Sequence, residues 1–344
     1  MFDRIAIMGA GALGTILGAY ISKTRQIDLI NRNKAHVEAL NKHGAQLRGF
    51  DDITIPVTAI KLDEMEGTYD LFLYFAKQTA NAVALPIMKK HSHSDTYICT
   101  GQNGLPEDAI AEFFEPDKVF GAPASWGGVM TEPGVVSVHN PEDKRKFSLG
   151  AYTGKITPEL LEVKKILELF CPVSLTENLA GYRWAKLTRN ATFSGMSTVM
   201  CMTFGEVAAD PKGIRCIARL GRECMKSAKA GGVTIALLDP DDYSGKYNYN
   251  SIEDEDKLVA LIQENLKESK VLGSMLNDLR RGYNNVEIDE INGIICHEGQ
   301  KHGIPTPYND MVVKIIKGIC EGKMPLDYSN INYFDDLLNT GFVI

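Results

Sequence analysis

Hydrophobic and polar positions along the first half of the chain predict strands that alternate with helices. Short apolar runs recur there, and most are followed by a segment with apolar residues at every third or fourth position. The apolar runs lie at residues 5–8, 27–30, 69–75, 96–100, 118–122 and 173–176. Because strands that alternate with helices are typical of parallel sheets, this half predicts an α/β domain.

The second half has a different pattern, with long helical segments and few strand-like runs. Helices are predicted at residues 182–202, 213–231, 256–281 and 286–302. Gly303 follows the last of these and provides a helix stop. We therefore expect two domains, an α/β domain at residues 1–178 and an all-α domain at residues 179–344.

Three segments depart from this simple alternation. Residues 126–149 contain short β segments and turns, which predict an antiparallel end of the first domain. Residues 239–256, DPDDYSGKYNYNSIEDED, are acidic and rich in turn-forming residues, and they predict an exposed loop between helices. The tail at residues 322–344 has no clear pattern, and neither it nor the acidic loop has an assigned role.

The first strand leads directly into a glycine-rich turn that opens a helix. Gly9, Gly11 and Gly14 form a G-x-G-x-x-G run. The first glycine allows a tight turn, the second lets a pyrophosphate approach the backbone, and the third lets the helix lie close to the strand. The N–H groups and partial positive charge of a helix N-terminus favour phosphate. We expect a dinucleotide site formed by Gly9, Gly11, Ala12, Leu13 and Gly14.

The end of the second strand selects between the two nicotinamide dinucleotides. An NAD site usually has Asp or Glu there, which holds the ribose 2′-hydroxyl. This chain has Asn31, which does not repel a 2′-phosphate, and Arg32, whose guanidinium can pair with one. The sequence therefore favours NADP(H). Asp28 is the acidic alternative, but it lies earlier in the strand and is expected to point elsewhere.

Two further polar side chains follow strands of the predicted sheet. Lys77 follows the strand at residues 69–75, and Asn103 follows the strand at residues 96–100. Because the carboxyl ends of parallel strands face the ligand crevice, both are candidate contacts to a cofactor or substrate. A surface lysine at a strand end and a local Asn-Gly turn are the alternatives.

Polar residues also recur in the helical half at spacings that share a helix face. Lys186 and Asn190 are four residues apart, as are Ser274 and Asp278. Glu287 opens the next predicted helix. Each of these residues alone is also compatible with a solvated helix surface.

Together with the glycine run, these segments resemble the ketopantoate reductase (2-dehydropantoate 2-reductase) family. The matching segments follow the family's order along almost the whole chain: GAGALG at 9–14, AKQ at 76–78, QNG at 102–104, KLTRN at 186–190, SMLND at 274–278 and VEIDEINGIICHEGQKHGIPTP at 286–307. The resemblance implies a Rossmann-type NADP-binding domain followed by an all-α domain like the C-terminal domain of 6-phosphogluconate dehydrogenase.

The resemblance also implies an activity, the NADPH-dependent reduction of a 2-keto acid to a 2-hydroxy acid. The type reaction converts ketopantoate to D-pantoate in pantothenate and CoA biosynthesis. By this resemblance Lys186 donates the proton, Glu287 is its acidic partner, and Lys77 lies on the cofactor side. The positions that match the substrate pocket are Asn103, which also borders the cofactor site, Asn190, Ser194, Ser274 and Asp278.

One departure from the family leaves the substrate open. The family usually has asparagine at the position of Ser194. A sibling reductase of another 2-keto acid therefore remains an alternative. Two further alternatives are an opine-type dehydrogenase and a non-catalytic NADP-sensing regulator.

Composition excludes several other classes of function. A net charge of −7 without a basic patch argues against nucleic acid as a partner. The 7 cysteines are scattered without a C-x-x-C pair, which predicts reduced thiols in a cytoplasmic protein and no zinc site. No apolar run approaches the roughly 20 residues of a membrane span, and no signal-peptide pattern is present. We expect a soluble monomer or homodimer without a metal.

Overall fold

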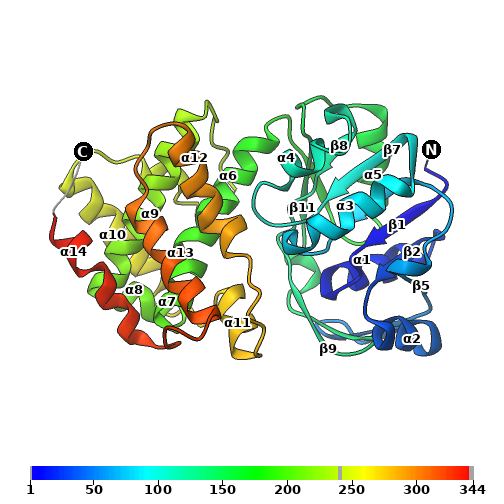
Figure 1. Ribbon diagram of the computed structural model, residues 1–344, viewed down its shortest axis with the longest axis horizontal. Helices are drawn as coiled ribbons and strands as arrows, with labels where there is room; N and C mark the ends of the chain where they lie inside the picture. Colours follow the sequence, from blue (N-terminus) through cyan, green and yellow to red (C-terminus); the bar gives the residue numbers. More distant parts are fainter. Residues whose placement is uncertain (1, 239–241, 341–344) are drawn as a thin grey trace. The chain divides into compact units, whose positions relative to one another are not determined.

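The computed structural model describes residues 2–238 and 242–340 (Figure 1). The chain divides into two compact units, Met1–Leu179 and Ala180–Ile344, so the division lies one residue after the predicted boundary. Residues 239–241 of the predicted acidic loop and residues 341–344 of the tail lie outside the described residues.

The N-terminal unit is built on an eight-stranded sheet with the order β12-β11-β8-β7-β6-β1-β2-β5. The strands are β1 (Ile5–Met8), β2 (Asp28–Asn31), β5 (Thr58–Lys61), β6 (Tyr69–Tyr74), β7 (Ser92–Thr100), β8 (Val119–Gly121), β11 (Phe147–Ala151) and β12 (Val173–Leu175). The strands from β5 to β8 run parallel, and β11 is antiparallel to β8. The chain reverses its direction across the sheet between β1 and β6, which is where a doubly wound sheet binds its ligand.

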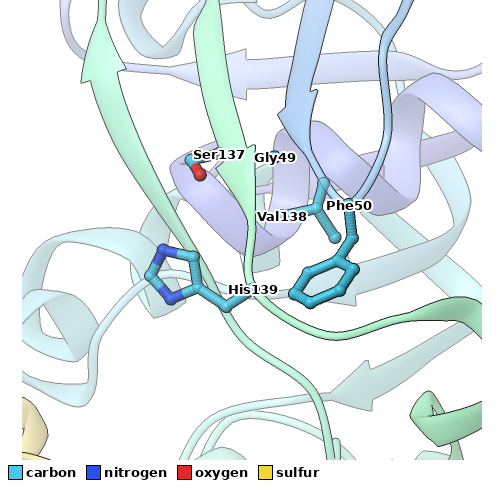
Figure 2. A pocket seen from close by; sticks show the side chains of 5 residues that line it. All are labelled: Gly49, Phe50, Ser137, Val138 and His139. Carbon is cyan, nitrogen blue, oxygen red and sulfur yellow. The ribbon is translucent and has the colours of Figure 1, made fainter.

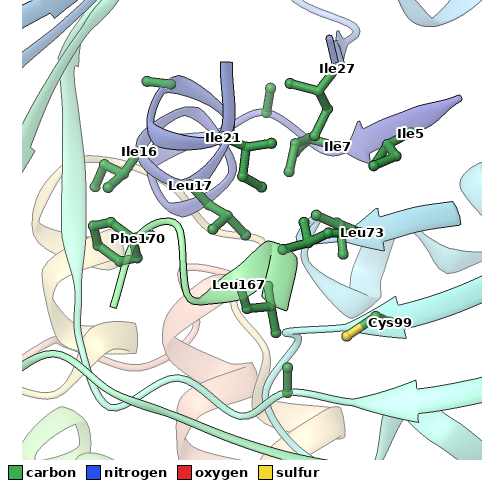
Figure 3. Close-up of a cluster of buried hydrophobic side chains, with 14 of the residues drawn as sticks. Ile5, Ile7, Ile16, Leu17, Ile21, Ile27, Leu73, Cys99, Leu167 and Phe170 are labelled. Atoms are coloured by element: carbon green, nitrogen blue, oxygen red, sulfur yellow. The ribbon is translucent and has the colours of Figure 1, made fainter. Parts of the chain in front are cut away.

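Both faces of this sheet are buried, as the alternation along β1 shows. Ile5 and Ile7 pack with α1 (Ala12–Ser22) and α5 (Pro158–Leu167) in the cluster of Figure 3. Ala6 and Met8 belong to a second cluster, together with residues of α3 (Asn81–Lys90) and α4 (Pro106–Ala111). Burial on both faces explains why the strand is a continuous apolar run. A further helix of this unit, α2 (Lys34–His43), packs beside β5.

Four short strands form a second sheet, which joins strands in the predicted β region 126–149 to strands between residues 45 and 55. Its order is β4-β3-β10-β9, with β3 (Ala45–Gly49), β4 (Ile53–Ile55), β9 (Gly128–Glu132) and β10 (Val135–Val138). The β9–β10 pair is antiparallel, as predicted for residues 126–149, but β10 pairs in parallel with the distant β3, and β11 returns to the main sheet. This sheet packs on α1, where Gly128 faces Ile16.

The C-terminal unit is all-α. Its helices are α6 (Leu179–Arg189), α7 (Gly195–Met200), α8 (Phe204–Ala209), α9 (Pro211–Ala230), α10 (Ile252–Leu266), α11 (Ser274–Arg280), α12 (Ile294–Lys301), α13 (Pro307–Cys320) and α14 (Asp335–Asn339), the last preceded by a 3₁₀ turn, Tyr328–Phe334. The predicted single helix at 256–281 is wrong, because residues 267–273 separate α10 from α11.

Two π-helical segments interrupt the predicted helices of this unit. The first π segment, Asn190–Ser194, joins α6 to α7, so the predicted helix at 182–202 is continuous but changes its winding. The second π segment, Asp289–Gly293, precedes α12. Such wider turns are rare and are frequent at functional sites.

The prediction of an exposed loop at 239–256 holds only in part for the described residues 242–256: Lys246, Asn248 and Asn250 are exposed, but residues 252–256 form the start of α10 and three tyrosines are buried. The aromatic rings of Tyr243, Tyr247 and Tyr249 are buried. The ring of Tyr247 covers Gly221 of α9, where an added Cβ would lie 2.2 Å from the ring. The acidic residues cap and brace the segment: the carboxylate of Asp242 accepts hydrogen bonds from two backbone N–H groups, those of Leu238 and Ser244.

Replacing Tyr247 by alanine should destabilise the helical unit. We expect Tyr247→Ala to lower the free energy of unfolding by about 3–5 kcal/mol, because it leaves a cavity in a packed interior. Tyr283→Ala is the control at a side chain that is 63% exposed, and it should change stability by less than about 0.5 kcal/mol. Urea unfolding of both variants measures the difference. Equally small effects would contradict the packing described for this segment.

Candidate active site

The three glycines of the first turn have different surroundings. Gly9 has φ of +93°, and a Cβ there would lie 2.3 Å from the nitrogen of Ala76. A Cβ on Gly14 would lie 2.5 Å from the carbonyl oxygen of Gly9. A Cβ on Gly11 would meet nothing within 4 Å. The fold itself therefore requires Gly9 and Gly14, whereas Gly11 leaves open space beside the turn.

The carbonyl oxygen of Ala10 fixes the shape of this turn. It accepts hydrogen bonds from Asn31 Nδ2 at 2.6 Å, His36 Nε2 at 3.0 Å and Thr15 Oγ1 at 3.1 Å. His36 Nδ1 accepts from the N–H of Gly134 at 2.9 Å, so the ring is neutral with its proton on Nε2. Burial lowers the pKa of His36, which keeps it neutral.

The two residues that were predicted to select the cofactor lie at the end of β2. Asn31 donates to Ala10, and its Oδ1 accepts from the N–H of Asn33 at 2.8 Å, so its amide shapes the turn. Arg32 is exposed. Asp28 lies at the opposite end of β2, where its carboxylate accepts from the hydroxyl of Tyr69 at 2.8 Å. Asp28 thus points elsewhere, as expected.

The segments 76–78 and 102–104 are hydrogen-bonded to each other after β6 and β7. Gln78 Nε2 donates to the carbonyl of Asn103 at 2.6 Å, and Gln102 Nε2 donates to the carbonyl of Ala76 at 2.9 Å. Within this frame Lys77 is exposed and Asn103 is half-buried. The sequence reasoning did not give the two glutamines a role, although both lie in the matched segments.

This edge of the sheet fits a dinucleotide. The open space beside Gly11 admits a pyrophosphate, and α1 starts there with Ala12 and Leu13 and without a side-chain cap on its first turn. The structure therefore brings together Gly9, Gly11, Ala12, Leu13 and Gly14 with Asn31 at the carboxyl ends of β1 and β2. The individual cofactor contacts remain predictions.

In the helical unit, Lys186 lies on α6, one turn before the first π segment. Its side chain is half-buried. Burial lowers the pKa of Lys186 to about 7, the positive charges of Arg183 and Arg189 lower it as well, and the carboxylate of Glu287 opposes them. An ammonium with this pKa exchanges its proton near neutral pH, as a general acid must.

Glu287 is buried, with 8% of its surface exposed, and interacts electrostatically with Lys186. It lies two residues before the second π segment. The structure thus brings together the two residues that the resemblance makes catalytic, from segments about a hundred residues apart in the chain.

The remaining predicted pocket residues of this unit are divided between two elements. Asn190 is half-buried and Ser194 is buried, at the two ends of the first π segment. Ser194 lies against the start of α11, because a Cβ added to Gly273 would lie 3.2 Å from the Cβ of Ser194. Ser274 is exposed and Asp278 is half-buried on α11. Their contacts with a substrate remain predictions.

One hollow in the N-terminal unit lies away from the candidate residues. A hollow of about 440 Å³ is lined by Gly49, Phe50, Ser137, Val138 and His139 (Figure 2), and it includes none of the candidate residues. Within residues 2–238 and 242–340, no group of three or more His, Cys, Asp or Glu side chains could hold a metal ion. No helix in the described part of the chain is both long and apolar enough to cross a membrane.

Comparison with family models identifies both halves of the chain. Residues 5–154 match the model of ketopantoate reductase PanE/ApbA, and residues 178–320 match the model of its C-terminal part. The resemblance inferred from the sequence motifs is therefore confirmed.

Curated relatives and solved structures agree with the family models. A 2-dehydropantoate 2-reductase of Pyrococcus horikoshii is 26% identical over 91% of this chain and 96% of its own length. A 2-dehydropantoate 2-reductase of Streptococcus pyogenes is 23% identical with the same coverage. A PanE/ApbA family ketopantoate reductase of Ralstonia eutropha superposes with a TM-score of 0.78 at 25% identity, covering 93% of this chain and 99% of that one.

One protein with a similar fold has a different activity. A D-mandelate dehydrogenase, solved with NADH and anilino(oxo)acetate, superposes with a TM-score of 0.78 at 21% identity, over 93% of this chain and 99% of that one. At this identity the likeness shows the fold, an α/β dinucleotide-binding unit and an all-α unit.

The different surroundings of the glycines predict different effects of substitution. Gly11→Ala should fold normally but weaken NADPH binding by at least about tenfold, because its methyl group occupies the open space. Gly9→Ala should instead lower stability by about 1–3 kcal/mol, because φ is positive and Ala76 is in the way. Thermal unfolding and NADPH titration by fluorescence separate the two effects. Parental NADPH affinity in Gly11→Ala would exclude this region as the pyrophosphate site.

Proposed function

The chain belongs to the ketopantoate reductase family, and we propose that it reduces a 2-keto acid to a 2-hydroxy acid with NADPH. As a member of this family it is an oxidoreductase that acts on CH–OH groups and uses a nicotinamide dinucleotide. Ketopantoate, with D-pantoate as the product in pantothenate and CoA biosynthesis, is the proposed substrate. The observation that carries the proposal is the half-buried Lys186, whose pKa is lowered by burial and raised by the charge of Glu287.

Lys186 is the proposed proton donor. The reduced nicotinamide supplies a hydride to the carbonyl carbon. Negative charge then develops on the carbonyl oxygen, where the Lys186 ammonium opposes it and transfers its proton from Nζ. The oxygen becomes the hydroxyl of the product, and the lysine is left as the neutral amine until it takes up a proton again.

Glu287 is proposed to hold the ammonium in place and to contact the substrate. Its carboxylate favours the charged form of Lys186 against the effects of burial and of the nearby arginines. The polar groups of Asn103, Asn190, Ser194, Ser274 and Asp278 are the proposed substrate contacts. These side chains would fix the orientation of the keto acid.

NADPH is the proposed cofactor because of the residues at the end of β2. Arg32 is exposed and can pair with a 2′-phosphate, and Asn31 adds no negative charge. Lys77 is a further proposed contact to the cofactor. The cysteines described are free thiols, which supports a reducing compartment, the cytoplasm. The proposed oligomeric state is a monomer or homodimer.

A sibling 2-keto acid is the second candidate substrate because of Ser194. The hydroxymethyl side chain of Ser194 is smaller than the asparagine usual in the family, and it is buried against the start of α11. A smaller side chain with one hydroxyl changes both the volume and the hydrogen bonding available to a substrate.

The test is the loss of NADPH absorbance with ketopantoate, beside a panel of aliphatic and aromatic 2-keto acids and of keto-acid and amine pairs. The highest kcat/KM with ketopantoate supports the type reaction. Activity with only another keto acid supports a sibling reductase, and a requirement for the amine supports an opine-type dehydrogenase. NADPH binding without oxidation by any of these would refute the reductase and favour an NADP-sensing regulator.

The pKa of Lys186 predicts the pH dependence of the reaction. The kcat/KM for reduction should fall as pH rises above about 7, because the lysine loses the proton that it must donate. Lys186→Ala should lower kcat by about 10²–10⁴-fold, with NADPH binding retained. Stopped-flow rates between pH 5 and pH 10 measure both effects. Unchanged turnover in Lys186→Ala would exclude it as the acid.

Arg32→Ala should change the preference between the two dinucleotides. We expect NADPH affinity to fall by about 10–100-fold, through loss of a charge-assisted contact, while NADH affinity is unchanged. Lys34→Ala is the matched control, since Lys34 is an exposed cation nearby that pairs with Glu38. Isothermal titration gives both affinities, and a constant ratio in Arg32→Ala would remove it from the 2′-phosphate site.

A further inference from the structure

A chain of buried hydrogen bonds connects four segments of the helical unit. Asn292 Nδ2 donates to the carbonyl of Ala191 at 3.1 Å and to Asn309 Oδ1 at 2.9 Å. Asn309 Nδ2 donates to Glu223 Oε2 at 2.7 Å. The side chains of Asn292 and Asn309 are fully buried, and Glu223 is 7% exposed. Polar groups removed from water in this way are costly unless they are paired.

Glu223 forms the far end of this chain and fixes α13. Its carboxylate also accepts from the backbone N–H groups of Tyr308 and Asn309, both at 2.9 Å, in the first turn of α13. Burial raises the pKa of Glu223 to about 8, while these N–H donors favour its ionised form. The three hydrogen bonds that the carboxyl group of Glu223 accepts therefore set the position of the Asn309 amide, and that amide orients Asn292.

Asn292 joins the two π segments. It belongs to the second π segment, and the carbonyl that it holds, that of Ala191, belongs to the first. Lys186 lies one turn before the first segment, and Glu287 lies just before the second. Gly195, directly after the first segment, gives Asn292 room, because a Cβ there would lie 3.3 Å from Asn292 Oδ1.

The register of a π turn determines where the residues before it point. A π turn contains one residue more than an α turn, and one residue corresponds to about 100° of rotation in an α-helix. If the first segment relaxed to an α-helix, Lys186 would rotate relative to α7 and move away from Glu287. The hydrogen bond from Asn292 to the Ala191 carbonyl opposes that relaxation, because breaking it leaves one N–H of the buried Asn292 amide without an acceptor.

We propose that Asn292, held by Asn309 and Glu223, is a positioning residue that locks both π segments and thereby keeps Lys186 beside Glu287. This inference rests on the proposed function of that pair. Asn292 acts through the backbone and contacts neither the substrate nor the cofactor in this role.

The test measures Lys186 directly in Asn292→Leu, which has a similar volume but no amide. The pH dependence of acylation of Lys186, followed by mass spectrometry of its peptide in the ligand-free protein, gives its pKa. We expect a shift of about one unit upward, because water reaches a lysine that has left its packed position. With the preferred keto acid, kcat should fall by about 10–100-fold and KM by less than about threefold in either direction.

Asn330→Leu is the matched control. Asn330 is also a fully buried asparagine of this unit, and its Nδ2 donates to the carbonyls of Val199, Pro325 and Asp327. It should lose stability to a similar degree, with the pKa of Lys186 and kcat unchanged. An effect of Asn292→Leu on stability alone, or equal pKa shifts in both variants, would overturn the positioning role.

Gly195→Ala keeps every hydrogen-bonding group, and it tests the positioning role of Asn292 if Asn292→Leu does not fold. Its methyl group presses on the Asn292 amide and should shift the pKa of Lys186 in the same direction, by a smaller amount. No shift would then overturn the inference. Because acylation needs no turnover, it tests Asn292 even if the parent protein reduces no keto acid, which would refute the proposed function separately.

Discussion

The helical unit depends on one constraint, a half-buried lysine whose positive charge needs an opposing charge. Burial and two nearby arginines disfavour the charge on Lys186, and the carboxylate of Glu287 is the opposing charge. Attraction between such groups is effective only if their positions are fixed, since a small displacement exposes each to water and weakens it. Side-chain hydrogen bonds to the backbone fix positions around the first π segment. Thr188 and Thr192 each donate to the carbonyl four residues earlier, and Asn292 donates to the carbonyl of Ala191.

In the N-terminal unit, neutral side chains hold the glycine-rich turn in a fixed position. Its turn must leave one side open for phosphates, so the turn is held from the other side. The carbonyl of Ala10 receives Asn31, His36 and Thr15 there, and the neutral imidazole also links the turn to Gly134 in the second sheet. A charged histidine could not accept the Gly134 N–H, so the low pKa of His36 preserves this arrangement.

Sequence reasoning predicted the strands of the main sheet and the glycine turn because these depend on local pattern, whereas the roles of Lys186 and Glu287 came from the resemblance to the family. The buried run before Gly9 and the paired spacing of Lys186 and Asn190 are visible within a few residues. The hydrogen-bond partners were not visible, since His36 and Asn292 bond groups distant in the chain. Glu223 left one signal that was not used, a carboxylate on the apolar face of α9 between Leu220 and Cys224.

The acidic segment after α9 shows why average polarity is a poor guide to exposure. Several of its polar groups are paired: Ser251 caps α10, and the fully buried Glu255 pairs with Arg215 and Arg219 of α9 at 3.0 and 3.3 Å. Once those groups are paired, burial of a few large rings decides the position of the backbone, since each aromatic ring covers far more apolar surface than a turn residue exposes. The spacing of tyrosines, rather than the excess of aspartates, therefore determines that this segment packs on α9.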